Sequence, residues 1–149
     1  MKTLGRASVL VLVLLLGRAS FAAAGEKDVL KALEKIKANL EAEVPYDKCA
    51  ESLVDAKAEI NMLKREVRKN QCFMKAVHQS YSWFKKGIND LGQMEQYQAQ
   101  AWKHSRRRWA GNRRLAKKYE NLAKSARQGL PEKWDKAAYY LDEAYGCLE

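Results

Sequence analysis

The hydrophobic positions of this chain recur with helical spacing. Val29, Leu33, Ile36, Leu40 and Val44 follow one another at steps of three and four residues. Such steps place side chains on one face of an α-helix, so the pattern predicts a helix over residues 26–44. Pro45, at the next position, ends it.

A stricter repeat of seven residues begins at Leu53. Eleven of the twelve residues at its two positions are apolar, and Asn70 is the exception. A seven-residue repeat keeps a narrow apolar stripe in contact with a partner helix over many turns, as in a coiled coil. We therefore expect one long helix over residues 46–86. The repeat consists of Leu53, Ile60, Val67, Met74, Tyr81 and Ile88 at one position and Ala56, Leu63, Asn70, Val77, Phe84 and Leu91 at the other.

Residues 87–92 combine two glycines with Asn89 and Asp90, a composition that favours a turn. A reversal at residues 89–90 predicts a third helix over residues 92–128, antiparallel to the second. Ile60 then lies opposite Tyr119, and Asn70 lies opposite Arg108 as a polar layer that fixes the register. The alternative is a single helix that runs through both glycines.

Gly129 and Pro131 predict the end of one helix and the start of a last one over residues 131–147. The expected fold class is therefore all-α: a long antiparallel helical hairpin, resembling a coiled coil, with a shorter helix at each end. At this length, residues 25–149 form a single domain.

The first 24 residues have the features of a secretory signal peptide. Lys2 and Arg6 precede an apolar run over residues 7–17, and small residues follow at positions 22–24. The run is about half of the roughly 20 residues that a transmembrane helix needs. We expect an exported protein without a transmembrane span, either periplasmic or secreted.

The charges are distributed unevenly along the chain. Residues 67–130 carry fifteen basic and three acidic side chains, whereas residues 25–66 carry eight and ten, and residues 131–149 carry two and five. This asymmetry indicates an acidic partner or surface. Nucleic acid is a weaker candidate, because an exported protein meets little of it.

The basic stretch of residues 102–118 also contains two tryptophans. On a helical wheel its charges lie away from Tyr97, Leu115 and Tyr119. Indole rings beside cationic side chains suit anionic lipid headgroups, lipopolysaccharide or acidic polysaccharide. The alternative is a solvated basic face with both tryptophans packed under the first or last helix. The candidate polyanion-binding residues are Trp102, Lys103, Arg106, Arg107, Trp109, Arg113, Arg114, Lys117 and Lys118.

Three cysteines in an oxidising compartment leave one thiol over. Cys49 and Cys72 would lie about 34 Å apart on one straight helix, too far for a disulfide. Cys72 is therefore expected to pair with Cys147 or with a cysteine of another subunit.

The chain contains none of the common catalytic, phosphate-binding or zinc-binding motifs. His78 and His104 lack partners at metal-ligand spacing, so neither a metal nor a cofactor is expected. We interpret the sequence as a non-enzymatic binding protein for an anionic surface.

The alternative is a structural or oligomeric coiled-coil assembly protein whose basic face meets an acidic protein partner. Homo-oligomers are compatible with this interpretation. In its bulk properties the chain also resembles the small basic helical chaperones of bacterial envelopes.

Overall fold

The computed structural model describes residues 25–65, 70–107 and 109–148, and no β-strand occurs among them. The first helix spans residues 25–41, and four further helices follow it. The expected all-α fold class is confirmed. The expected signal peptide lies outside the described residues. The later helices are α2 (Tyr46–Leu63), α3 (Gln71–Ser105), α4 (Ala110–Gln128) and α5 (Leu130–Gly146).

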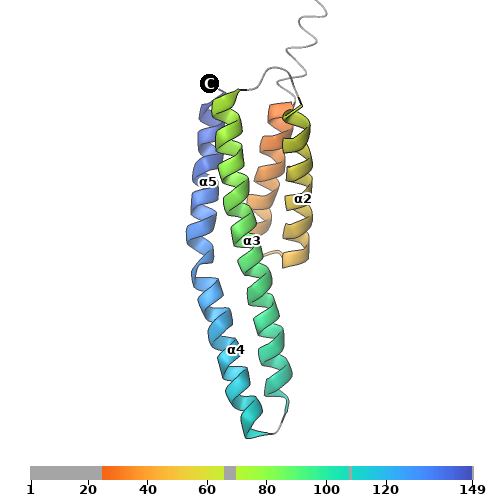
Figure 1. The fold of residues 1–149 in the computed structure, drawn as a ribbon, viewed down its shortest axis with the longest axis vertical. Coiled ribbons are helices and arrows are strands. Elements are labelled where there is room, and N and C mark those ends of the chain that lie inside the picture. The colour runs from red at the N-terminus through yellow and green to blue at the C-terminus, as the bar shows by residue number, and fades with distance from the viewer. Residues whose placement is uncertain (1–24, 66–69, 108, 149) are drawn as a thin grey trace, which may run out of the picture.

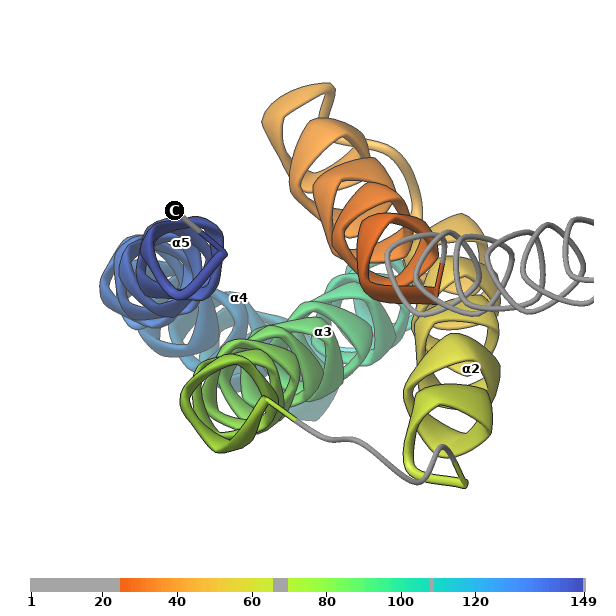
Figure 2. The same ribbon diagram turned by 90° about the horizontal axis from the view of Figure 1, so that it is seen from above.

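The helices form an elongated bundle around α3 (Figure 1). On one side of α3, α4 and α5 follow each other end to end and run antiparallel to it. On the other side, the first helix and α2 cover only the upper half of α3, and the view from above shows the same division (Figure 2). The lower part of α3 and α4 therefore project beyond the rest of the molecule.

The hydrophobic core lies between α3 and the first helix, α2 and α5. The first helix contributes Val29, Leu33 and Ile36, all fully buried, and α3 contributes Phe73 and Phe84. Two polar ties cross this core: the Ser80 hydroxyl donates to the Ala137 carbonyl at 2.8 Å, and the Asn39 amide donates to the Ser52 hydroxyl at 2.8 Å. The paired polar groups fix the helices in register without leaving an unsatisfied donor.

The predicted reversal at residues 89–90 is wrong, because α3 continues through Gly87 and Gly92. Both glycines serve close packing. A Cβ atom on Gly87 would lie 2.6 Å from Trp134 Nε1, and one on Gly92 would lie 2.9 Å from the Tyr46 ring. Each glycine thus admits an aromatic ring against the helix backbone, and this contact offsets the low helix propensity of glycine.

The predicted helix over residues 46–86 is also wrong, since α2 ends at Leu63 and α3 begins at Gln71. Asn70 is the residue that starts α3. Its side-chain oxygen accepts a hydrogen bond from the Phe73 amide at 3.1 Å, which is the bonding of a helix N-cap. Asn70 is therefore a cap and does not form a polar layer within a helix seam.

The predicted partner of Asn70, Arg108, lies outside the described residues. Its neighbours Arg107 and Trp109 lie beyond the opposite end of α3 from Asn70.

The chain instead reverses between α3 and α4, around residues 106–109 (Figure 1). Tyr119 consequently stacks on Tyr97, with ring centroids 6.2 Å apart, and Ile60 belongs to the core instead.

A disulfide joins Cys72 at the start of α3 to Cys147 after α5, with a Cα–Cα distance of 5.8 Å. It is one of the two pairings that the sequence left open. The Asn70 amide reinforces it by donating to the Cys147 carbonyl at 2.8 Å. Cys49 is a free, fully buried thiol whose Sγ lies 3.4 Å from the Val44 carbonyl oxygen.

Candidate functional site

The candidate site lies on the projecting part of the molecule, residues 95–127, which we call the arm. The contiguous core reaches only to Leu91 on α3 and resumes at Leu130 on α5. Within the described part of the arm the buried residues are Ala101, Ala116 and Ala123. The arm is thus a pair of helices outside the main core.

Small side chains and stacked rings hold the two helices of the arm together. The alanines let the backbones approach closely, and the His104 ring stacks on Tyr119 with centroids 5.7 Å apart. His104 Nδ1 also lies 3.2 Å from Asn112 Oδ1, across the turn. These contacts fix the end of the arm without large aliphatic residues.

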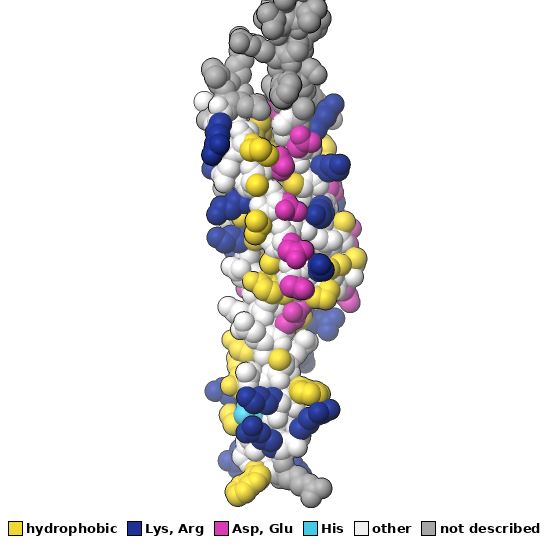
Figure 3. Space-filling view, turned by 90° about the vertical axis from the view of Figure 1, so that its right-hand side faces the viewer, with side chains coloured by type: hydrophobic (Ala, Val, Ile, Leu, Met, Phe, Trp, Pro, Cys, Tyr) yellow, Lys and Arg dark blue, Asp and Glu magenta, His cyan; other side chains and the backbone are white. Residues whose placement is uncertain are grey.

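The arm is strongly basic. Residues 96–119 contain eight lysines and arginines and no aspartate or glutamate. Figure 3 shows the contrast on one face: acidic side chains line the upper part of the bundle among basic ones, whereas basic, hydrophobic and histidine side chains but no acidic ones are visible at the end of the arm. The arm therefore carries a local positive potential that the rest of the molecule does not share.

All nine candidate polyanion-binding residues are exposed. Trp102 is 59% exposed and Trp109 is 80% exposed, so neither packs under the first helix or α5. Within the described residues, the seven basic members form no ion pair with an acidic side chain. Their charges are therefore available to an external anion.

One internal contact joins a charge to an indole ring. The guanidinium of Arg106 lies 3.9 Å from the centroid of the Trp102 ring. This cation–π contact holds the planar guanidinium against the ring face and leaves its N–H donors at the surface.

The start of α4 adds to the positive character of this end. Trp109 occupies the N-cap without a side-chain hydrogen bond, and the first turn has no acidic residue. The partial positive charge of the helix N-terminus is therefore not neutralised by the chain itself.

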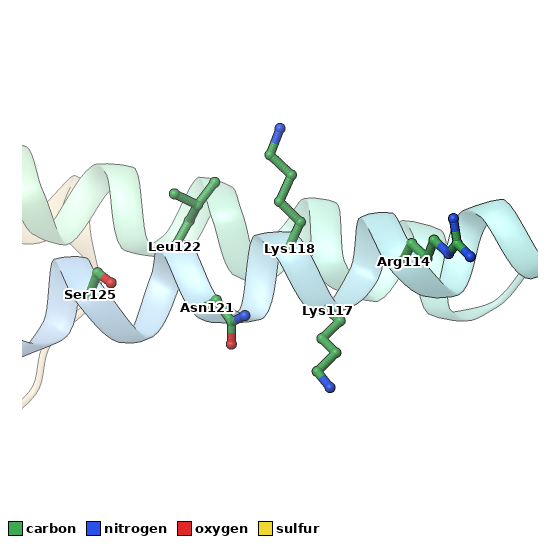
Figure 4. A pocket seen from close by; sticks show the side chains of 6 residues that line it. All are labelled: Arg114, Lys117, Lys118, Asn121, Leu122 and Ser125. Carbon is green, nitrogen blue, oxygen red and sulfur yellow. The ribbon is translucent and has the colours of Figure 1, made fainter.

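The basic side chains of α4 do not converge on one point. An open hollow on its outer surface is lined by Arg114, Lys117, Lys118, Asn121, Leu122 and Ser125. All six belong to one helix, and the side chains of Lys117 and Lys118 diverge from it (Figure 4). The arrangement suits an extended anionic surface better than a single small anion.

A second cavity, at the base of the arm, was not predicted from the sequence. It is lined by Leu40 of the first helix, Val44 after that helix, Met94 of α3 and Trp134 of α5, with Arg127 of α4 beside them. These residues come from distant segments, so no local spacing in the sequence signals them. Glu95, also in the lining, accepts a hydrogen bond from the Tyr46 amide at 2.9 Å and ties α3 to the start of α2.

No group of three or more potential metal ligands occurs among the described residues. His78 lies on α3 in the bundle, and burial and the nearby Lys64 lower its pKa. His104 takes part in the ring stack of the arm. Both histidines therefore take part in the packing of α3 against its neighbours.

No helix in the described part of the chain has both the length and the hydrophobicity to cross a bilayer. No family model, curated protein or solved structure matches this chain. The chemistry of the arm is therefore the basis for assigning a function.

Proposed function

We propose that this protein is an exported, non-enzymatic helical binding protein whose arm contacts an anionic surface. The candidate surfaces are lipid headgroups, lipopolysaccharide and acidic polysaccharide. One observation carries the proposal: the basic side chains and both exposed tryptophans gather at the free end of a helix pair that contributes little to the core.

Charge supplies the attraction in this proposal. Each lysine or arginine near an anionic membrane contributes about 1 kcal/mol before screening by salt. Seven described basic residues of the arm, from Lys103 to Lys118, therefore give a useful affinity even if only half of them reach the surface. Because the Debye length shrinks to about 3 Å at 1 M ionic strength, high salt should release the protein.

The test is to replace six charged residues of the arm with glutamine and to measure retention on heparin and on anionic liposomes. We expect retention to be lost at moderate salt, because residues 25–149 then carry nineteen basic and eighteen acidic side chains. The six are Arg106, Arg107, Arg113, Arg114, Lys117 and Lys118.

The matched control removes six exposed lysines from the bundle outside the arm. It lowers the net charge equally and should leave most of the retention intact. Unchanged retention of the arm variant, or equal loss in both variants, would refute the proposal. The control residues are Lys27, Lys31, Lys57, Lys64, Lys75 and Lys85.

A second candidate function is that of an oligomeric assembly protein with an acidic protein partner or a second copy of itself. The outer surface of α2 favours it, since Val54 is 68% exposed and Met62 is 54% exposed beside Glu51 and Asp55. Light scattering tests this candidate. A monomer at micromolar concentration in low salt would count against self-assembly.

A further inference from the structure

We propose that the partner of the arm is an anionic lipid bilayer and that the arm meets it end-on, with Trp102 and Trp109 at the level of the headgroups. This inference rests on the proposed function and narrows it to one surface and one orientation.

The exposed indoles are the first argument for lipid. Charge alone would satisfy a soluble polysaccharide, yet the end of the arm presents one tryptophan that is 80% exposed and another that is 59% exposed. Tryptophan is enriched at membrane interfaces, because its apolar ring enters the headgroup region while its N–H remains solvated. Two such rings beside the same turn form an interfacial anchor.

The Arg106–Trp102 contact is the second argument. With its guanidinium 3.9 Å from the ring centroid, Arg106 lies beside the group that would enter the interface. A lipid phosphate at that depth would accept charge-assisted hydrogen bonds from the guanidinium while the ring contacts the upper acyl region. The pair thus matches the two chemistries of a phospholipid at neighbouring depths.

The orientation follows from the distribution of charge. Lys117 and Lys118 diverge from α4, and neighbouring residues of a helix lie about 100° apart, so an arm lying flat would turn part of its charge away from the membrane (Figure 4). An upright arm keeps both residues within about 12–14 Å of Trp109, close to the screening length of about 10 Å.

The other regions of the molecule favour the same orientation. Acidic side chains outnumber basic ones in residues 25–66, by ten to eight, and in residues 131–149, by five to two. The first helix, α2 and α5, which these regions form, lie mainly away from the end of the arm (Figure 1). Anionic headgroups repel them, so they should remain in solution.

Insertion is tested with vesicles of equal parts phosphatidylcholine and phosphatidylglycerol, containing lipid brominated near the top of the acyl chain. Bromine should quench the tryptophan fluorescence of the bound wild-type protein. The double variant Trp102→Ala/Trp109→Ala retains Trp83 and Trp134 and should show no quenching. It should also partition into the vesicles about tenfold more weakly, a larger loss than its loss of heparin binding.

The matched control is Tyr139→Ala, which removes an exposed aromatic ring from α5. It should leave both quenching and partition unchanged. Vesicle or heparin binding by the wild type without quenching would overturn insertion and leave the proposed function standing. Failure to bind either ligand would remove both proposals.

Orientation is tested with a fluorophore on a cysteine introduced at position 111 or 125. A Cβ on Gly111 meets no atom within 4 Å, and Ser125 is exposed. The two positions lie on the same side of α4, about 21 Å apart along it. Cys49 is fully buried and the other cysteines are disulfide-bonded, so the label reaches only the new thiol.

An upright arm should shield the label at position 111 from aqueous acrylamide and leave the label at position 125 open to it. Equal shielding of the two labels would show a flat arm, and shielding of neither would show that the end stays outside the headgroups. Either result would overturn the end-on orientation.

Discussion

Glu43 adopts a left-handed backbone conformation after the first helix, with φ of 52°. Its amide bonds to the Leu40 carbonyl, and the Val44 amide bonds to the Asn39 carbonyl. This is the Schellman pattern, in which the left-handed position favours glycine because a Cβ is strained there. The helix end therefore contains a correctable local strain.

Glu43→Gly should stabilise the protein by about 1 kcal/mol, because it removes that strain at some cost in chain entropy. Urea denaturation measures the change. Glu41→Gly is the control: it lies within the last turn of the same helix and should destabilise by about 1 kcal/mol. A lower denaturation midpoint for Glu43→Gly would contradict this account of the helix end.

His78 gives the stability a dependence on pH. Burial, and secondarily the charge of Lys64, lowers its pKa below the usual value of about 6.5. As the pH falls through 6.5, the unfolded chain gains this proton before the folded protein does. The folded state should therefore lose stability in acid through this residue.

His78→Gln should reduce the loss of stability between pH 7 and about pH 5, because glutamine does not titrate. Denaturation curves of both proteins at the two pH values give the comparison. An equal loss in the two proteins would show that other groups control acid stability.

At the scale of the element, Gly87 lets the Trp134 ring pack against the backbone of a continuous α3. The Trp134 ring occupies the space that a side chain would need, because a Cβ on Gly87 would lie 2.8 Å from the ring atom Cδ1. The same contact leaves Trp134 Nε1 buried without a hydrogen-bond partner. The close packing of the Trp134 ring thus offsets the cost of leaving its Nε1–H without a hydrogen-bond acceptor.

Gly87→Val should destabilise the protein by about 1–3 kcal/mol, because the Trp134 ring must move. Gly111→Ala, on α4, should stabilise it by up to about 1 kcal/mol, since an alanine there meets no neighbour. Thermal unfolding of the two variants should therefore shift in opposite directions. Shifts in the same direction would contradict the assigned roles of the glycines.

The sequence predicted which side chains are buried better than it predicted where helices end. Ile60, Leu63, Val77, Phe84 and Ile88 lie at the seven-residue repeat and are buried. The repeat gives the spacing of the buried residues, and the same spacing continues from α2 into α3 although the helix is interrupted between them. It therefore could not distinguish one long helix from α2 followed by α3.

The residue types that mark helix ends also occur in other structural roles. Asn70 fitted a polar seam position, yet it is an N-cap. Gly87 fitted a turn, yet it accommodates Trp134. The Gly87 contact depends on Trp134, which is distant in sequence, and Asn70 also donates to the distant Cys147 carbonyl. Local spacing reveals neither contact.

The candidate site was easier to identify from sequence than its position in the molecule. A run of charged residues without acidic neighbours remains solvated in almost any helical fold, and all nine residues are exposed. Their position at the free end of an arm depends on the turn around residues 106–109, whereas the glycine pattern predicted a turn at residues 89–90.

At the scale of the molecule, the disulfide closes the end of the bundle opposite the arm. It joins residues 75 positions apart, and a loop of this length loses much entropy when it closes. The covalent bond therefore restricts the unfolded chain while leaving the arm untouched.

Cys72→Ser/Cys147→Ser should lower the free energy of unfolding by about 2–4 kcal/mol. The measurement is guanidinium denaturation followed by circular dichroism. Retention on heparin should be unchanged below the transition, because the arm does not depend on the bond. Loss of retention in the folded variant would show that the two ends of the molecule are coupled.

The buried Cys49 thiol has a consequence for maturation. Three cysteines allow three pairings, and two of them are incorrect. Once α2 docks, burial raises the pKa of Cys49 and encloses its sulfur, so that less thiolate is present to attack another disulfide. Tertiary packing therefore protects the native pairing, and scrambled isomers should accumulate mainly when oxidation precedes that step.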